Sequence, residues 1–116
     1  VVHSSPVVEV GIDIKPGSFP NSINRNNKGN ISVAIFSSGT FNATEVDRAT
    51  VNFEGASPLD IGKTPEDING DGLLDIVFHF STQKMSLPDG ASEACLTGET
   101  IGGTLFEGCD SVRLVK

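Results

Sequence analysis

The amino-acid sequence predicts an all-β fold, a single antiparallel β-sandwich of the immunoglobulin-like or jelly-roll-like kind. Thirteen glycines and six prolines divide the 116-residue chain at short intervals. No segment between them keeps an apolar period of about 3.6 residues over several turns, so long amphipathic helices are not expected. Short stretches of β-branched and aromatic residues lie between the turn residues, which is the pattern of short strands in a sandwich or barrel.

The expected strands follow from the alternation of apolar and polar side chains, because successive side chains of a strand point to opposite faces of the sheet. In "NISVAIFS" the alternation places Ile31, Val33 and Ile35 on one face. In "LLDIVFHF" it places on one face Leu74, Ile76, Phe78 and Phe80. We expect both faces to lie in the core. The strands expected along the chain are Val7–Ile14, Ile31–Phe36, Thr50–Glu54, Leu74–Phe80, Leu96–Thr100, Thr104–Glu107 and Ser111–Val115.

Two connections between these strands carry signals of their own. The segment "KPGSFPNSINRNNKGN", Lys15–Asn30, is rich in Pro, Gly and Asn, which favour turns, and we expect a long polar loop there. A loop of that length in a compact domain is usually functional or fixed by contacts with another part of the structure. The segment "NATEVDRAT" predicts one helical turn, with Asn42 or Thr44 as its cap.

Length and charge limit the functions open to the chain. Its 116 residues give room for one domain with one hydrophobic core. We divide the chain into an N-terminal extended arm, residues 1–6, and a calcium-binding β-sandwich domain, residues 7–116. The eight Lys plus Arg against fifteen Asp plus Glu give a net charge of −7, so the surface should repel phosphate backbones and anionic lipids. No apolar run is long enough to cross a bilayer. We therefore expect no nucleic-acid partner and no membrane insertion.

The two cysteines, Cys95 and Cys109, bear on the location of the protein. The chain starts at Val1 without Met, which suits a mature exported protein, although the first residues lack the regions of a signal peptide. In an exported protein the two cysteines most simply form one disulfide that closes a short loop; the alternative is two buried thiols. We expect a secreted protein, extracellular or at the cell surface.

The stretch "PEDINGDGLLDIVFHF" carries the strongest chemical signal. It matches D-x-N-x-D-G-x-x-D, with Asp67, Asn69, Asp71, Gly72 and Asp75. In a loop of this kind the side chains at positions 1, 3 and 5 converge, the glycine permits the sharp turn, and the carbonyl at position 7 faces inward. These are hard oxygen ligands suited to Ca²⁺. The expected ligands are Asp67, Asn69, Asp71, the carbonyl of Leu73, and Asp75 either directly or through water.

Three alternatives to this calcium loop are an EF-hand, a Mg²⁺ site and a metal-free turn. An EF-hand needs a bidentate Glu at position 12 of the loop, where this chain has Phe78, so the EF-hand is excluded. Mg²⁺ is less suited because it demands stricter octahedral geometry. A metal-free turn held by hydrogen bonds from the backbone to side chains is the third alternative. It is disfavoured because three acidic residues close together, with only Lys63 nearby in the sequence, would repel one another.

Several motifs in order resemble a known family. They are "IDIKPGSFPNSIN", "KGNISVAIFSSGTFNATEVDRATVNF", "EDINGDGLLDIVFHF", and "LTGET" with "FEGCDSVR". The chain from Val8 onward is similar to an uncharacterised module that recurs in exported bacterial and archaeal proteins. The resemblance implies an extracellular β-sandwich whose acidic loop is a calcium site, often attached to larger secreted or surface proteins. This copy departs from the family pattern in standing almost alone, with only the arm added. The resemblance implies no reaction.

Catalysis is not expected. His3 lies in the arm, and His79 alternates with Phe78 and Phe80 on a strand, so neither histidine is placed as a catalytic base. The chain contains no G-x-S-x-G, no H-E-x-x-H and no C-x-x-C motif. Two N-x-[ST] sequons, at Asn30 and Asn42, are glycan acceptors if the host glycosylates the protein.

The sequence leaves three functions open. The first is a calcium-stabilised structural subunit that assembles head to tail into a filament or surface layer, by adding its arm to the sheet of a neighbouring copy. The valines expected to make this contact are Val1, Val2, Val7, Val8 and Val10. The second is a carbohydrate-binding or adhesive module, which is less favoured because the chain has no Trp and no Tyr. The third is a spacer or stabilising cap of a larger secreted protein.

Overall fold

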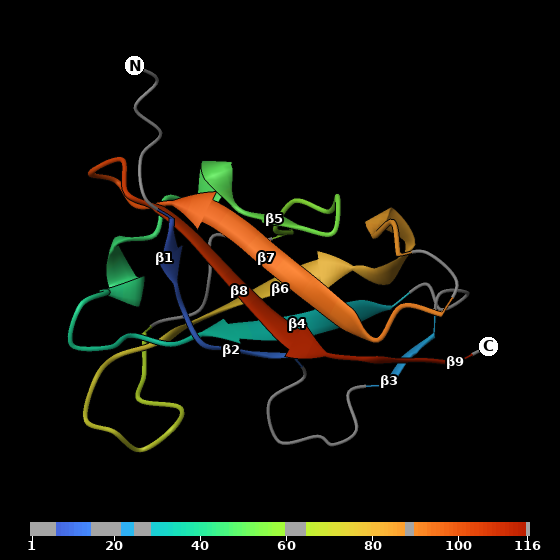
Figure 1. Ribbon diagram of the computed structural model, residues 1–116, viewed down its shortest axis with the longest axis horizontal. Coiled ribbons are helices and arrows are strands. Elements are labelled where there is room, and N and C mark those ends of the chain that lie inside the picture. Colours follow the sequence, from blue (N-terminus) through green and yellow to red (C-terminus); the bar gives the residue numbers. More distant parts are fainter. Residues whose placement is uncertain (1–6, 15–21, 25–28, 60–64, 88–89, 116) are drawn as a thin grey trace.

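A computed structural model of the chain describes residues 7–14, 22–24, 29–59, 65–87 and 90–115 (Figure 1). The described residues form nine strands, β1 Val8–Glu9, β2 Ile12–Ile14, β3 Ser22–Asn24, β4 Asn30–Ile35, β5 Asn52–Phe53, β6 Ile76–Ser81, β7 Glu93–Glu99, β8 Leu105–Ser111 and β9 Arg113–Val115. The helices among them are three short 3₁₀ turns, η1 Ala43–Glu45, η2 Arg48–Thr50 and η3 Thr82–Lys84. The predicted all-β class is therefore confirmed. None of the described helices is long and apolar enough to cross a membrane.

The strands form two main sheets and one small one. The four-stranded sheet has the order β1-β8-β7-β5, the three-stranded sheet has the order β2-β4-β6, and β3 pairs with β9. In Figure 1, β7 and β8 run diagonally across β4 and β6. Both main sheets contribute to one hydrophobic cluster, since Phe53 and Phe106 of the first sheet and Phe78 and Phe80 of the second are buried in it. The core therefore lies between the two main sheets.

The alternation in the sequence correctly predicts most of the core face. Ile31, Val33 and Ile35 of β4 are buried, and in the antiparallel register of β4 and β6 they lie opposite Phe80, Phe78 and Ile76, which are also buried. Leu74 is the exception. It lies before the start of β6 and is 52% exposed, so its predicted place on the core face is wrong. The reason is that the acidic loop extends to Asp75, and strand geometry begins only after it.

The expected strand Val7–Ile14 is divided between the two main sheets. β1 pairs with β8, whereas β2 pairs with β4, and Val10 and Gly11 make the change from one sheet to the other. The carbonyl of Gly11 accepts a hydrogen bond from the backbone N–H of Phe36 at 2.9 Å. A Cβ at Gly11 would lie 3.3 Å from the Phe36 ring, so the backbone crosses close to this side chain.

Two strand pairings differ from the predicted antiparallel arrangement. β1 runs parallel to β8, and β3 runs parallel to β9. β3 also lies inside Lys15–Asn30, where the sequence predicted only loop. Both parallel pairs join a strand near the N-terminus to one near the C-terminus, where no hairpin forces antiparallel pairing. The local turn signals in the sequence carry no information about such distant partners.

The helical segment "NATEVDRAT" forms two 3₁₀ turns rather than one. The side chain of Asn42 caps η1 by accepting a hydrogen bond from the backbone N–H of Thr44 at 3.0 Å, which confirms Asn42 as a cap. The side chain of Asp47 caps η2 in the same way, through the N–H of Ala49 at 3.1 Å. These turns carry the chain from the end of β4 to β5.

Candidate functional site

The acidic loop projects from the body of the molecule just before β6 (yellow-green in Figure 1). Its two ends are held together by a pair of backbone hydrogen bonds between Glu66 and Asp75, at 3.1 and 2.8 Å. Within the loop the backbone turns sharply at Gly70 and Gly72, whose φ angles are +78° and +86°. Residues other than glycine rarely adopt such angles, so the predicted role of Gly72 in the turn is confirmed.

The carboxylates of the loop accept hydrogen bonds from the loop's own backbone. Asp67 accepts from the N–H groups of Gly70 and Gly72, both at 2.8 Å. Asp71 accepts from the N–H of Leu73 at 2.9 Å, and the side chain of Asn69 accepts from the N–H of Asp71 at 3.4 Å. These bonds fold the loop back on itself and turn its side-chain oxygens inward.

Asp67, Asp71 and Asp75 each offer a carboxylate oxygen, and these oxygens lie within 4.8 Å of one another. Asp67 and Asp71 are exposed, whereas Asp75 is fully buried. The structure thus brings together the three acidic residues predicted as ligands, with Asn69 and Leu73 in the same loop. A group of hard oxygens on a tight loop fits the ligand preference of Ca²⁺, which takes six to eight oxygens at about 2.3–2.6 Å. The chemistry of the donor set therefore fits the predicted ion.

Asp75 has a structural role that the sequence did not reveal. One of its oxygens accepts a hydrogen bond from the backbone N–H of Ser37 at 2.8 Å, and the other accepts from the N–H of Ile68 at 2.9 Å. Ser37 follows β4, so Asp75 ties the acidic loop to the end of a core strand. Each carboxylate oxygen has two lone pairs, so both can accept these bonds and still face a cation.

The hydroxyl of Ser37 extends this connection. It donates a hydrogen bond to the carbonyl of Leu74 and accepts one from the N–H of Ala43 at 2.8 Å. Ser37 is buried, and through these bonds it joins the acidic loop to η1. Sequence reasoning missed this residue, since a serine after a strand has no pattern that indicates a partner far along the chain.

The charges of the acidic loop are not balanced by a basic side chain within the described part of the chain. Asp67, Asp71 and Asp75 have backbone N–H groups as their hydrogen-bond partners there. Neutral N–H donors reduce the repulsion among three carboxylates but do not neutralise their charge. A bound divalent cation would do so.

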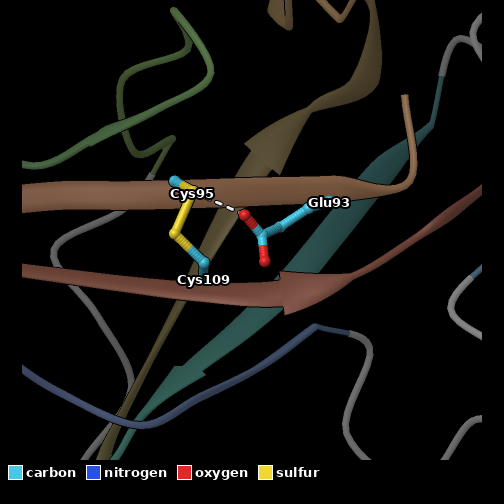
Figure 2. A group of neighbouring side chains, drawn as sticks. All are labelled: Glu93, Cys95 and Cys109. Carbon is cyan, nitrogen blue, oxygen red and sulfur yellow. Dashed lines mark hydrogen bonds between the residues drawn. A yellow bond between two sulfur atoms is a disulfide. The ribbon is translucent and has the colours of Figure 1, made fainter. Parts of the chain in front are cut away.

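The predicted disulfide is confirmed, and the alternative of two buried thiols is wrong. Cys95 and Cys109 are joined, and they lie directly opposite each other on β7 and β8 with their Cα atoms 4.1 Å apart. Figure 2 shows the side chain of Glu93 beside this bond, with its Oε1 3.8 Å from the Cys95 Sγ. Disulfide sulfurs are not thiolates, so this trio does not form a metal site. The cross-link stabilises the β7–β8 pair by about 3 kcal/mol in the chain-entropy model.

The arm residues predicted for assembly are only partly within the described residues. Val1 and Val2 lie outside them. Val8 and Val10 are partly buried against the protein's own hydrophobic cluster, whereas Val7 is 53% exposed. Val8 and Val10 therefore anchor the start of the described chain to its own domain, and of the described valines in this set Val7 is the one that is exposed.

Both sequon asparagines are exposed. Asn30 is the first residue of β4, opposite Ser81 of β6. The side-chain oxygen of Asn42 accepts hydrogen bonds from both the N–H and the hydroxyl of Thr44, at 3.0 and 2.6 Å. Glycosylation at either residue stays a prediction, and Asn42 also has a structural role as a helix cap.

A second pair of carboxylates lies where β2 meets β8. Burial, and then the charge of the nearby Asp110, raise the pKa of Asp13 above its ordinary value of 3.8. Asp110 also accepts a hydrogen bond from the N–H of Ile14 at 3.0 Å, which links the two strands. Because its pKa is raised in the folded state, Asp13 favours the fold most below pH 3.8, and this contribution is lost as the pH rises through the raised pKa. We assign this pair a structural role.

Comparison with protein-family models, with curated proteins and with solved structures found no significant match to this chain.

Proposed function

We propose that the chain is an extracellular structural subunit, a β-sandwich stabilised by Ca²⁺, which assembles head to tail into a filament or surface layer through its N-terminal arm. The disulfide between Cys95 and Cys109 supports a location outside the reducing cytosol. The family resemblance of the sequence points to the same location and to the same use of the acidic loop.

The calcium part of the proposal rests on the convergence of three carboxylates beside β6. Asp67, Asp71 and Asp75 would hold the ion, with Asn69 and the carbonyl of Leu73 completing the protein ligands. The ion would supply the positive charge that the described part of the loop lacks. Because Asp75 is hydrogen-bonded to Ser37 at the end of β4, binding would also fix the loop against the core. The role proposed for Ca²⁺ is therefore structural.

The observation that carries the assembly part is the position of β1. It is an edge strand of the four-stranded sheet, and no described strand pairs with its other side. A free edge of this kind can accept an extended segment from another molecule. In the sequence the arm directly precedes Val7 and β1, so it is attached to the same strand that has the free edge.

The opposite edge of this sheet is closed by side chains. β5 covers only Leu96 and Thr97 of β7. On either side of it, the N–H of Glu99 donates to the Thr50 hydroxyl at 2.8 Å, and the N–H of Cys95 donates to the Glu54 carboxylate at 2.7 Å. Glu54 makes this contact from a left-handed backbone, with a φ of +49°. Donors satisfied in this way are unavailable to another chain, so within the four-stranded sheet the β1 edge is the better candidate to receive the arm.

Filament formation by the purified chain tests the proposal. In millimolar Ca²⁺ we expect filaments or sheets in negative-stain electron micrographs. Deletion of residues 1–5 should abolish them, because the arm supplies the contact. A calcium chelator should also reduce them, since the loop next to the core would lose its ion. Monodisperse monomers of the unmodified chain under every condition would contradict the assembly.

A carbohydrate-binding or adhesive module is the second candidate, favoured by one cavity. A pocket of about 360 Å³ adjoins the acidic loop and is lined by Ser37, Ser38, Phe41, Asn42, Thr44, Gly72, Leu73 and Leu74. Bound Ca²⁺ could ligate sugar hydroxyls at its mouth. Sugar sites usually present an exposed aromatic ring, whereas Phe41 is 5% exposed and its ring packs on Phe106. This buried ring makes the module the weaker candidate.

A further inference from the structure

A groove of about 380 Å³ crosses the outer face of the four-stranded sheet, at the end where β1 begins. It is lined by Val7, Thr50, Thr97, Gly98, Glu99, Leu105, Phe106 and Glu107. The register explains its shape, since the outward pairs Thr97–Glu107 and Glu99–Leu105 flank the inward-facing pair Gly98–Phe106. The absence of a side chain at Gly98 leaves room for the Phe106 ring, which would lie 2.8 Å from a Cβ there. Because Gly98 and Phe106 face inward, their backbone forms the floor of the groove between the two outward pairs.

The chemistry of the groove is mixed. Val7 and Leu105 give it an apolar end beside β1, and Val7 is one of the few large apolar side chains left exposed among the described residues. Glu99 and Glu107 place two carboxylates on its rim, and neither has a cationic partner within the described part of the chain. A fitting occupant is apolar and carries no negative charge.

The first five residues of the chain have this character. "VVHSS" contains two valines, one histidine and no acidic residue, in a protein whose net charge is −7. Its valines match the apolar end of the groove, and its histidine matches the carboxylate rim. The volume of the groove is at the small end of the range for binding pockets, about 300–1,000 Å³, which suits a short peptide segment.

The register of β1 favours the arm of another molecule over the protein's own. Val8 lies beside Phe106 in parallel strands, so a continuation of β1 before Val7 would pass Leu105, where β8 begins. The groove crosses the strands instead of following β1. For the chain's own arm to enter it, the backbone would have to turn at Pro6, and a proline restricts the residue before it to extended conformations.

We propose that this groove is the acceptor for the N-terminal arm of a second copy of the chain, with Val1 and Val2 against Val7 and Leu105, and His3 beside the Glu99 and Glu107 rim. This inference rests on the proposed head-to-tail assembly. It places the acceptor on the sheet face next to the β1 edge, so the arm of the second copy crosses the strands instead of adding a strand along that edge. Each molecule then presents one arm and one groove, so the contact can repeat from copy to copy, and it produces a filament when the rotation between copies does not close.

Substitutions in the groove test this inference. Leu105→Asp places a carboxylate at its apolar end and should weaken the contact about tenfold or more, because burying an unpaired charge is unfavourable. Ser111→Asp is the matched control, since it adds the same charge to the outer face at the far end of β8, and it should assemble as the unmodified chain does. Thr97→Arg fills the groove from an exposed position and should act like Leu105→Asp. Thermal melting of each variant reports whether it is folded.

Mixing two defective chains gives the sharper result. The Leu105→Asp chain keeps its arm, and a chain without residues 1–5 keeps its groove, so each alone should be monomeric in sedimentation velocity. Their equimolar mixture should form dimers and nothing larger, because only one productive contact remains. A dimer shows that the arm of the Leu105→Asp chain still binds an intact groove, and the melting curve of this variant shows whether its own domain is folded.

Three outcomes would overturn the inference, and they are distinguishable. Filaments of Leu105→Asp equal to those of the unmodified chain, together with loss of filaments on arm deletion, would place the acceptor elsewhere and leave the proposed function intact. If the arm shields the groove from solvent to the same extent at every protein concentration, the groove is occupied by the chain's own arm. Failure of the unmodified chain to assemble at all would refute the proposed function, and this inference with it.

Discussion

Replacing Asp75 by alanine is expected to lower the free energy of unfolding by about 3–5 kcal/mol, even without Ca²⁺. Asp75 is fully buried, and its two oxygens accept the N–H groups of Ser37 and Ile68. Each hydrogen bond to a charged group contributes about 1.5–3 kcal/mol, and its loss leaves a buried donor without a partner. Urea denaturation measures the change directly. The melting temperature should fall by roughly 10–20 °C.

Asp71→Ala is the control for this effect. Asp71 belongs to the same loop and the same carboxylate group, but it is exposed and accepts from the N–H of Leu73 and not from another element. Without Ca²⁺ the Asp71→Ala substitution should lower the free energy of unfolding by less than about 1 kcal/mol, as most surface substitutions do. Equal effects of the two substitutions would show that Asp75 does not anchor the loop to β4. Asp75→Asn, which keeps one oxygen acceptor, should fall between them.

Gly108→Val is expected to destabilise the domain by about 3 kcal/mol or more, because it pushes the N-terminal strand away from β8. A Cβ at Gly108 would lie 2.7 Å from the carbonyl oxygen of Val10 and 2.7 Å from a methyl of Ile12. The first of these atoms belongs to the backbone, which cannot move without disturbing β1 and β2. Overpacking a dense interior costs about 1–3 kcal/mol when side chains can adjust, and more when they cannot.

Gly39→Val provides the comparison for Gly108→Val. Nothing lies within 4 Å of a Cβ at Gly39, which is in a turn. Its substitution should change the free energy of unfolding by less than about 1 kcal/mol in the same urea titration. Limited proteolysis adds a local readout, since Gly108→Val should expose the chain before Ile12 to cleavage and Gly39→Val should not. Similar stability of the two variants would contradict the close packing of Val10 on β8.

The parts of this structure that the sequence predicted well depend on local pattern. The core faces of β4 and β6 follow from alternation. A strand with one face on the core has apolar residues at every second position, and this pattern is visible in consecutive residues. The convergence of Asp67 and Asp71 follows from glycine placement within a few residues. The cap of η1 at Asn42 is equally local. In each case the partners are close in the chain.

The parts that the sequence could not predict depend on distant partners. Asp75 was expected only as a ligand at the end of a loop, yet its anchoring bond is to Ser37, 38 residues away. The change of sheet between β1 and β2 depends on Gly108 at the other end of the chain. Leu74 illustrates the limit of alternation, since it fits the periodic pattern of β6 but lies in the loop before it. Periodicity assigns a face, but it does not give the residue where the strand begins.

The melting temperature of the unmodified chain with and without Ca²⁺ tests the calcium site most directly. For a dissociation constant of about 10⁻⁴ M, as in extracellular calcium modules, Ca²⁺ at about 10 mM should stabilise the fold by about 2.7 kcal/mol, because the ion binds only the folded state. The chelator-treated chain should melt roughly 10 °C lower. Asp71→Ala, which folds without the ion, should lose most of this difference. An unchanged melting temperature of the unmodified chain in Ca²⁺ and in chelator would contradict the account.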